Sequence, residues 1–315
     1  MKKILAFLLA FLLALSLAGC NSGTTAEPPA VNQDNRNPVE EAKQDFPVII
    51  ADSYGREITI VKKPEKLISL APANTEILFA IGAGDRIFGV TDYCEYPAAA
   101  LEKAKIGDFS NPNIELIIEI EPDVVFVAAG VQREVLNQLE EVGIVVVTLD
   151  AENLDQVLKN ISLAGKIVGN EEESSKLVVQ MEARIQAVKT KLAAAAATPT
   201  IFFEVWDDPL MTAGPNTFIN DLINLAGGSN IASDAAEQYG QFSMELLLER
   251  DPEIYLINDH AHTPKDVMTR PNYGSLSSVK NEKVYAINDD LVTLPGPRLV
   301  EGLEEMARIL HPELF

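Results

Sequence analysis

One segment of this chain occurs twice, and that repetition limits the possible folds more than any other feature of the sequence. Residues 115–127 read ELIIEIEPDVVFV and residues 245–257 read ELLLERDPEIYLI. Glu, Leu, Glu and Pro fall at the same offsets, and apolar positions match apolar positions except where Ile120 faces Arg250. Because self-similarity of this length indicates a duplicated supersecondary unit, the sequence predicts one structural plan used in two lobes.

Each copy alternates short apolar runs with helical patterns. A helix in each copy must end before the proline of the repeat, Pro122 or Pro252. This alternation predicts an α/β fold with two Rossmann-like lobes, each built on a parallel sheet with helical crossovers. For the first copy we expect strands at 66–70, 87–90, 124–128 and 144–149 and helices at 75–81, 115–120 and 132–142; for the second, strands at 200–205, 254–258 and 283–287 and helices at 217–226, 244–250 and 298–310.

Between the copies lies the most regular helical pattern of the chain, at residues 171–192. Asn170 with Glu173 resembles a capping box at its start. The pattern predicts one long backbone helix that joins the two lobes and couples them stiffly, with an ordinary surface helix of one lobe as the alternative. Its apolar positions recur at spacings of three and four residues, namely Leu177, Met181, Ile185, Val188 and Leu192.

The first residues have the features of a secretory signal. Lys2 and Lys3 precede an apolar run, and Leu17-Ala18-Gly19-Cys20 resembles a bacterial lipobox. We therefore expect residues 1–19 to be removed and Cys20 to be lipidated, the alternative being a cysteine that follows the signal by chance. Residues 20–45 are polar and rich in Pro, which predicts a disordered tether. The predicted domains are then an N-terminal lobe at 46–169, the linking helix at 170–193 and a C-terminal lobe at 194–315.

Charge and motif content exclude several classes of function. The chain has 47 acidic against 25 basic residues, a net charge of −22, so a nucleic-acid partner is not expected. No Gly-x-Ser-x-Gly elbow, phosphate-binding loop or dinucleotide fingerprint supports the alternative of an α/β enzyme. Cys94 is the only cysteine besides Cys20, too few for a cluster-binding enzyme of the nitrogenase type. A structural surface lipoprotein is a third alternative, which the duplicated plan disfavours.

Several short motifs, taken together, resemble the helical-backbone class of ABC-importer binding proteins, which take up cobalamin, ferric siderophores or haem, with its cobalamin-binding members nearest. The resemblance implies an extracytoplasmic, lipid-anchored protein that performs no catalysis, needs no cofactor and delivers its ligand to a permease dimer. The ligand itself would contain cobalt or iron. The motifs are SLAPANTE at 69–76, TDY at 91–93 followed by YP at 96–97, NIE at 113–115, EPD at 121–123, TAG at 212–214 and GPR at 296–298.

In that family one glutamate on each lobe docks into arginine pockets of the permease. The matching residues of this chain are Glu115 and Glu245, which the repeat also places at equivalent positions of the two lobes. Stabilisation of a helix N-terminus by an acidic side chain is the alternative role.

The ligand is expected at loops that follow the carboxyl ends of the strands. Trp206 would stack on a macrocycle, unless it belongs to the core. Arg298 would meet an acidic ligand group, or cap a helix. His260 would ligate a metal centre, or lie in a solvated loop together with His262. The aromatic residues favour a corrinoid, with siderophore and haem as alternatives, and the scarcity of histidine argues against zinc and manganese relatives. The predicted ligand-binding residues are Ala73, Asn74, Tyr93, Phe109, Trp206, Asp207, His260 and Arg298.

The lipobox yields a direct prediction. Replacing Cys20 with Ala removes the thiol that would carry the lipid, so the variant should leave the membrane fraction and appear in the medium. Fractionation with labelled fatty acid checks this, with the unaltered chain as the control. Retention of the variant and of its label in the membrane would contradict the prediction.

Overall fold

The computed structural model describes residues 45–260 and 262–315, which belong to one unit of the chain. The predicted signal, the Cys20 anchor and nearly all of the tether lie outside the described residues. Within the described part, no helix is both long and apolar enough to cross a bilayer.

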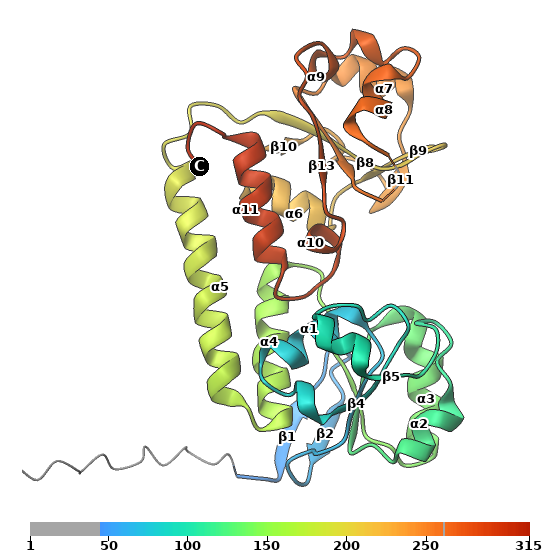
Figure 1. Ribbon diagram of the computed structural model, residues 1–315. Coiled ribbons are helices and arrows are strands. Elements are labelled where there is room, and N and C mark those ends of the chain that lie inside the picture. Colours follow the sequence, from blue (N-terminus) through green and yellow to red (C-terminus); the bar gives the residue numbers. More distant parts are fainter. Residues whose placement is uncertain (1–44, 261) are drawn as a thin grey trace, which may run out of the picture. The chain divides into compact units, whose positions relative to one another are not determined.

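The first lobe is built on a five-stranded sheet in the order β5-β4-β3-β6-β7, in which every pair of neighbours is parallel. All four residues of β6 are buried because helices cover both faces of the sheet (Figure 1), which explains the continuous apolar run. An antiparallel hairpin of β1 (Val48–Ala51) and β2 (Glu57–Ile60) precedes this sheet. The lobe's other elements are β3 (Leu67–Ser69), α1 (Pro72–Ala80), β4 (Ile87–Val90), β5 (Ala104–Lys105), α2 (Ile114–Ile120), β6 (Val124–Val127), α3 (Arg133–Glu141) and β7 (Val146–Thr148).

The second lobe has a six-stranded sheet in the order β11-β9-β8-β12-β13, with β10 also paired to β8. β8, β10, β12 and β13 are parallel, whereas β9 and β11 add an antiparallel edge. The α/β fold with two Rossmann-like lobes is thereby confirmed, and the antiparallel edge extends it. The elements are β8 (Thr200–Asp207), β9 (Leu210–Ala213), α6 (Phe218–Leu225), β10 (Ser229–Asn230), β11 (Tyr239–Gln241), α7 (Met244–Arg250), β12 (Ile254–Asn258), α8 (Pro264–Thr269), α9 (Ser277–Lys280), β13 (Val284–Ile287), α10 (Asp290–Thr293) and α11 (Leu299–Leu310).

The sequence repeat is also a structural repeat. Residues 111–120 and 241–250 have the same pattern of buried and exposed positions. The side chains of Asn113 and Ser243 each accept a hydrogen bond from the third backbone N–H that follows. The helices end at Glu121 (φ 52°) and Asp251 (φ 37°), both left-handed and both followed by proline. The same local rules therefore build α2 in one lobe and α7 in the other.

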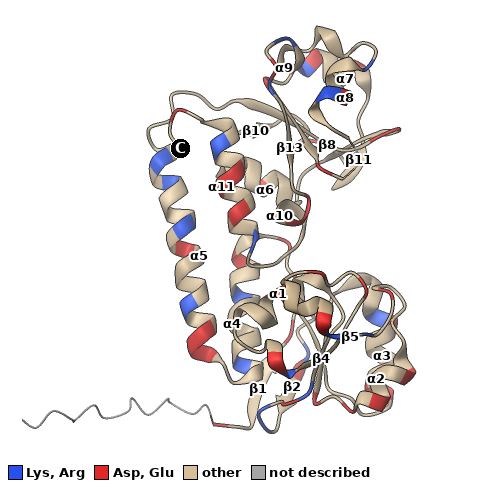
Figure 2. Cartoon of the chain, viewed as in Figure 1, with Lys and Arg blue, Asp and Glu red and all other residues tan. Residues whose placement is uncertain are grey.

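The link between the lobes is a pair of helices, of which the sequence analysis found one. α5 (Glu171–Leu192) has the predicted bounds, and α4 (Leu154–Val168), which it missed, packs beside it. A Cβ on Gly165 would lie 2.0 Å from the Oγ of Ser174, so glycine permits this close contact. Glutamates in the first turn and lysines in the last turn of α5 complement the helix dipole (Figure 2).

The predicted capping box at the start of α5 is wrong. Asn170 makes no side-chain cap, because its amide is used by the first lobe instead. Its Oδ1 accepts a hydrogen bond from Arg86 at 3.0 Å, and its Nδ2 donates to the carbonyl of Ile81 at 2.7 Å. This side chain thus attaches the start of the long helix to the lobe that precedes it.

One hydrophobic core continues from the first lobe through α5 into the second. Phe126 of β6, Met181 and Ile185 of α5, Phe203 of β8 and Leu303 of α11 belong to the same cluster of buried residues. α5 also packs against α11. A continuous core of this kind favours the stiff coupling that the long helix predicts, and the coupling itself stays a prediction.

A buried ion pair joins residues 222 positions apart in the chain at the junction of the lobes. Glu76 of α1, 3% exposed, accepts hydrogen bonds from Nε and Nη2 of Arg298 at 3.0 and 2.5 Å. Nη2 of Arg298 also donates to Asp290 at 3.2 Å. Burial disfavours the charge of Arg298, but the two carboxylates outweigh burial and raise its pKa above the ordinary value.

Removing Arg298 should destabilise the protein strongly because Glu76 would remain buried without a partner. We expect Arg298→Ala to lower the free energy of unfolding by about 3–5 kcal/mol. The matched control is Arg184→Ala, since Arg184 of α5 forms the same bidentate contact with Glu304 but is half-exposed. That change should cost about 1 kcal/mol or less. Urea unfolding of both variants measures the difference, and equally small losses would contradict the prediction.

Candidate functional site

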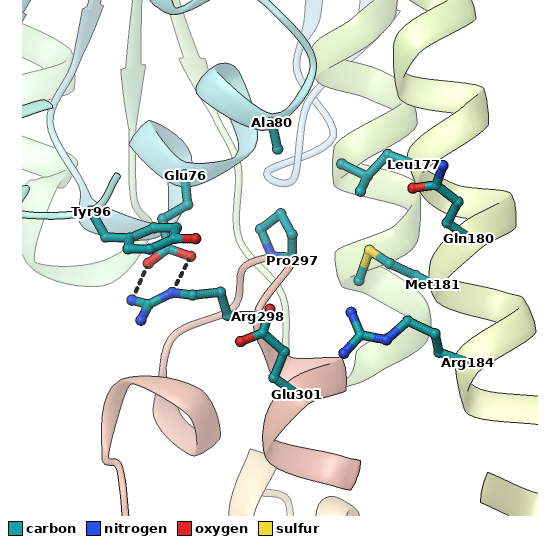
Figure 3. Close-up of a pocket in the computed structure, with 10 residues that line it drawn as sticks. All are labelled: Glu76, Ala80, Tyr96, Leu177, Gln180, Met181, Arg184, Pro297, Arg298 and Glu301. Atoms are coloured by element: carbon teal, nitrogen blue, oxygen red, sulfur yellow. Dashed lines mark hydrogen bonds and ion pairs between the residues drawn. The ribbon is translucent and has the colours of Figure 1, made fainter. Parts of the chain in front are cut away.

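Segments that follow strands of the two sheets meet between the lobes. Tyr96 lies in the segment after β4, and Arg298 lies in the segment after β13. The guanidinium carbon of Arg298 is 4.1 Å from the centre of the Tyr96 ring, and Figure 3 shows the two side chains together with Glu76. Segments that follow strands of different lobes are therefore in contact, which is the arrangement that the predicted site requires.

In the first lobe one buried side chain connects three segments that follow strands. Nε2 of Gln132 donates to the carbonyls of Leu70 and Phe109, both at 2.7 Å, and its Oε1 accepts from the N–H of Ala128 at 2.8 Å. These residues follow β3, β5 and β6. Sequence analysis missed Gln132, because a glutamine before a helix gives no signal of its own. Its role is to position the backbone that carries Phe109.

The structure places the four predicted residues of this lobe at different depths. Tyr93 is exposed and Phe109 is half-buried, so both are accessible. Ala73 and Asn74 are buried in α1, where the Asn74 amide donates to the carbonyl of Val127 at 3.1 Å. This hydrogen bond attaches α1 to the end of β6. Contact of the four residues with a ligand stays a prediction.

In the second lobe Trp206 lies near the end of β8 and is 50% exposed. Its indole Nε1 donates to the carbonyl of Asp208 at 3.0 Å, which fixes the ring on the protein surface. The alternative interpretation of Trp206 as a core residue is therefore wrong. A half-exposed indole held by a hydrogen bond presents an apolar face on which a flat ligand can stack.

The two histidines of the predicted loop each pair with a carboxylate. Nε2 of His262 is 3.0 Å from Asp207, and Nε2 of His260 is 3.5 Å from Asp289. Burial opposes ionisation of Asp207, but the hydrogen bond and charge of His262 and the charge of Arg270 together outweigh burial and lower the Asp207 pKa. Burial raises the pKa of Asp289. His260 is exposed, and the described residues contain no group of three or more His, Cys, Asp or Glu that could hold a metal ion.

A buried charge network supports the end of β8. Glu204 accepts two hydrogen bonds from Arg270, at 2.6 and 2.9 Å, and one from the hydroxyl of Tyr255 at 2.5 Å. Arg270 also lies 4.0 Å from Asp207. Because each buried charge is paired and hydrogen-bonded, the network fixes the position of Asp207 and of the neighbouring Trp206. Sequence analysis missed both partners, since they are 66 residues apart.

Two cavities lie between the lobes. One, of about 170 Å³, separates Glu76, Tyr96 and Arg298 from Leu177 and Met181 of α5 (Figure 3). The second, of about 470 Å³, lies between residues 152–153 and residues of the second lobe. Its lining residues are Glu152, Asn153, Asn216, Asp221 and Gln238. Arg298 lines the first cavity, and its guanidinium is paired with the carboxylates of Glu76 and Asp290. Its side chain does not cap α11, so the predicted alternative role as a helix cap is wrong.

The predicted docking residues occupy the same position in their two helices. Glu115 of α2 and Glu245 of α7 are both exposed. Neither forms an ion pair or a side-chain hydrogen bond with any other residue that the structure describes. Both carboxylates are therefore available to a partner.

Comparison with known proteins identifies relatives over nearly the whole chain. A family model described as "Periplasmic binding protein" matches residues 67–291. The chain is 34% identical to the uncharacterized ABC transporter substrate-binding lipoprotein YvrC of Bacillus subtilis, over 98% of this chain and 96% of that protein. It is 30% identical to the vitamin B12-binding protein of Vibrio cholerae, over 80% of this chain and 92% of that protein.

A solved structure agrees with these sequence relatives. The periplasmic vitamin B12 binding protein BtuF of Vibrio cholerae superimposes with a TM-score of 0.70 at 28% sequence identity. The superposition covers 79% of this chain and 98% of that protein. The two-lobe architecture is thus shared by the whole of that structure.

Proposed function

The chain belongs to the periplasmic binding protein family, and from this premise we propose that it captures a corrinoid of the cobalamin type for an ABC importer. Its relatives support the coarser role of an extracytoplasmic substrate-binding protein. The identity of the ligand is a more specific proposal, and it is argued from the side chains at the strand ends.

Exposed aromatic residues at the strand ends of both lobes carry the proposal. Trp206 is 50% exposed and fixed by its hydrogen bond to Asp208, while Tyr93 and Phe109 are accessible in the first lobe. Large aromatic side chains gain free energy when they leave water, and they stack favourably on flat conjugated rings. Aromatic surfaces on two facing lobes suit a ligand with a broad, flat macrocycle.

Charge distinguishes a corrinoid from the other ligands of this transporter class. The second lobe presents carboxylates at its strand ends, including Asp207, Asp259 and Asp289, whereas Arg270 and Arg298 are both engaged by buried glutamates. Carboxylates accept hydrogen bonds from the amide groups on the rim of a cobalamin. They repel the carboxylates of haem and of anionic ferric siderophores. This pattern favours the corrinoid over both alternatives.

The remaining parts of the proposal concern position and partner. We propose that Cys20 carries a lipid that holds the chain at the outer face of the cell membrane, and that Glu115 and Glu245 dock it onto the permease. His260 would approach the metal of the bound ligand, whose cobalt belongs to the ligand and not to the protein. An α/β enzyme is the alternative from another class, and the relatives named above, which are binding proteins, support binding over catalysis.

The stacking role of the aromatic residues can be measured. Trp206→Ala and Phe109→Ala should each weaken cobalamin binding by about 1–3 kcal/mol, because each change removes an apolar ring from the contact. Isothermal titration calorimetry with cobalamin gives the affinities. Trp206→Phe, which keeps an aromatic ring, should lose less than Trp206→Ala.

The matched control is Phe88→Ala, since Phe88 is 46% exposed but lies near the start of β4. Its affinity should equal that of the unaltered protein. Binding of haem or of a ferric siderophore in place of cobalamin would overturn the corrinoid proposal, while the binding-protein role would remain.

The docking role of the glutamates gives a separate prediction. Glu115→Ala and Glu245→Ala should leave ligand affinity unchanged but slow uptake, because the loss of one partner of an interfacial charge pair costs about 2–5 kcal/mol. The double variant should nearly abolish uptake. Ligand affinity, permease binding and transport are compared on the same proteins.

Glu134→Ala is the control for this experiment, since Glu134 lies at the first turn of α3 rather than in the repeated helices. Docking should weaken with added salt in the unaltered protein to the extent that the charge pairs stay exposed. If the Glu115 and Glu245 variants lose ligand affinity but keep permease binding, these residues line the ligand site instead.

A further inference from the structure

Each repeated helix also exposes one large apolar side chain. Ile118 of α2 is 40% exposed and Leu248 of α7 is 37% exposed, although the preceding residue of each helix, Ile117 or Leu247, is fully buried. A single exposed apolar residue is common on protein surfaces. Its recurrence at the equivalent position of both lobes, inside the repeat, indicates a shared role.

Acidic residues flank the exposed apolar residue in both helices. Residues three and four apart lie on one face of a helix, so Glu115, Ile118 and Glu119 share a face of α2. The corresponding face of α7 carries Glu245, Leu248 and Glu249. We call these two sets of three residues the acidic-apolar faces.

The acids of these faces are available, unlike others close by in the sequence. Asp123 forms an ion pair with Lys62, and Asp234 forms one with Arg250. In contrast, Glu119 and Glu249 are exposed and form no ion pair or side-chain hydrogen bond with other described residues. The four glutamates of the two faces therefore retain their capacity to bind cations of a partner.

We propose that the two acidic-apolar faces dock onto the two halves of the permease, with Ile118 and Leu248 as apolar anchors. This inference rests on the proposed function and specifies the contact beyond Glu115 and Glu245. Each half of the permease would offer an apolar recess flanked by at least two cationic side chains. Two equivalent faces on one chain match a partner that has two equivalent halves.

Charge favours the permease over other binding partners of these faces. A second copy of the chain carries the same net charge of −22 and would be repelled, and so would an anionic lipid surface. Burial of the apolar anchor contributes binding free energy that salt does not screen, whereas the exposed glutamates contribute free energy that salt does screen. The two contributions can thus be separated by experiment.

The test measures binding of the chain to the permease and ATPase complex that supports uptake of its ligand in the same cell, reconstituted in nanodiscs, at low and at high salt. Ile118→Ala and Leu248→Ala should each lower the affinity about tenfold at both salt concentrations. Glu119→Gln and Glu249→Gln should lower it at low salt only. Val179→Ala is the matched control, because Val179 of α5 is a 63% exposed apolar residue outside the two faces, and it should bind normally.

The outcomes separate this inference from the proposed function. If Glu115→Ala weakens docking while Ile118→Ala and Leu248→Ala bind normally at both salt concentrations, the apolar anchors are wrong and the proposed function stands. If the unaltered chain does not bind the complex, both fail. Unchanged ligand affinity and unfolding of the Ile118 and Leu248 variants show that a loss of docking does not come from misfolding.

Discussion

The contact between Glu76 and Arg298 is the interaction on which the arrangement of the site depends. A carboxylate and a guanidinium that leave water together lose much hydration free energy, and only a well-formed bidentate contact compensates for it. Here both oxygens of Glu76 accept hydrogen bonds, and the Tyr96 ring covers the guanidinium. Since the two partners come from different lobes, this geometry constrains how the strand ends of one sheet face those of the other. The hydrophobic core that passes through α5 supplies the second constraint, at the opposite side of the same junction.

Much of the fold could be predicted because its determinants are local. The duplicated helix follows from short-range pattern, proline and capping rules, and the apolar run of β6 and the bounds of α5 follow from short-range pattern. α4 was not predicted, although Asn153 caps it and Gly169 ends it. The antiparallel β9 follows β8 directly, and its four residues are too few to show a clear alternation.

The site was predictable to a smaller extent. Strand ends are predictable once strands are, so Tyr93, Phe109 and Trp206 could be named from the sequence. Their supports could not, because each support is a long-range pair: Gln132 with Phe109, and Glu204 with Arg270. The same reason explains Asn170, whose sequence context indicates a cap while its actual partners, Arg86 and Ile81, lie 84 and 89 residues away. The partner of such a polar side chain is determined by the tertiary fold, so its role cannot be predicted from neighbouring residues in the sequence.

The Gln132 network has a consequence for how this architecture diversifies. The amide of Gln132 holds Leu70, Phe109 and Ala128 only through their main-chain atoms. Main-chain groups are the same whatever side chain a residue carries, so a substitution of the half-buried Phe109 leaves its hydrogen bond with Gln132 intact. The side chain presented at this strand end is therefore independent of the backbone position that Gln132 fixes. The Phe109 side chain can therefore change while the backbone of its loop keeps its position.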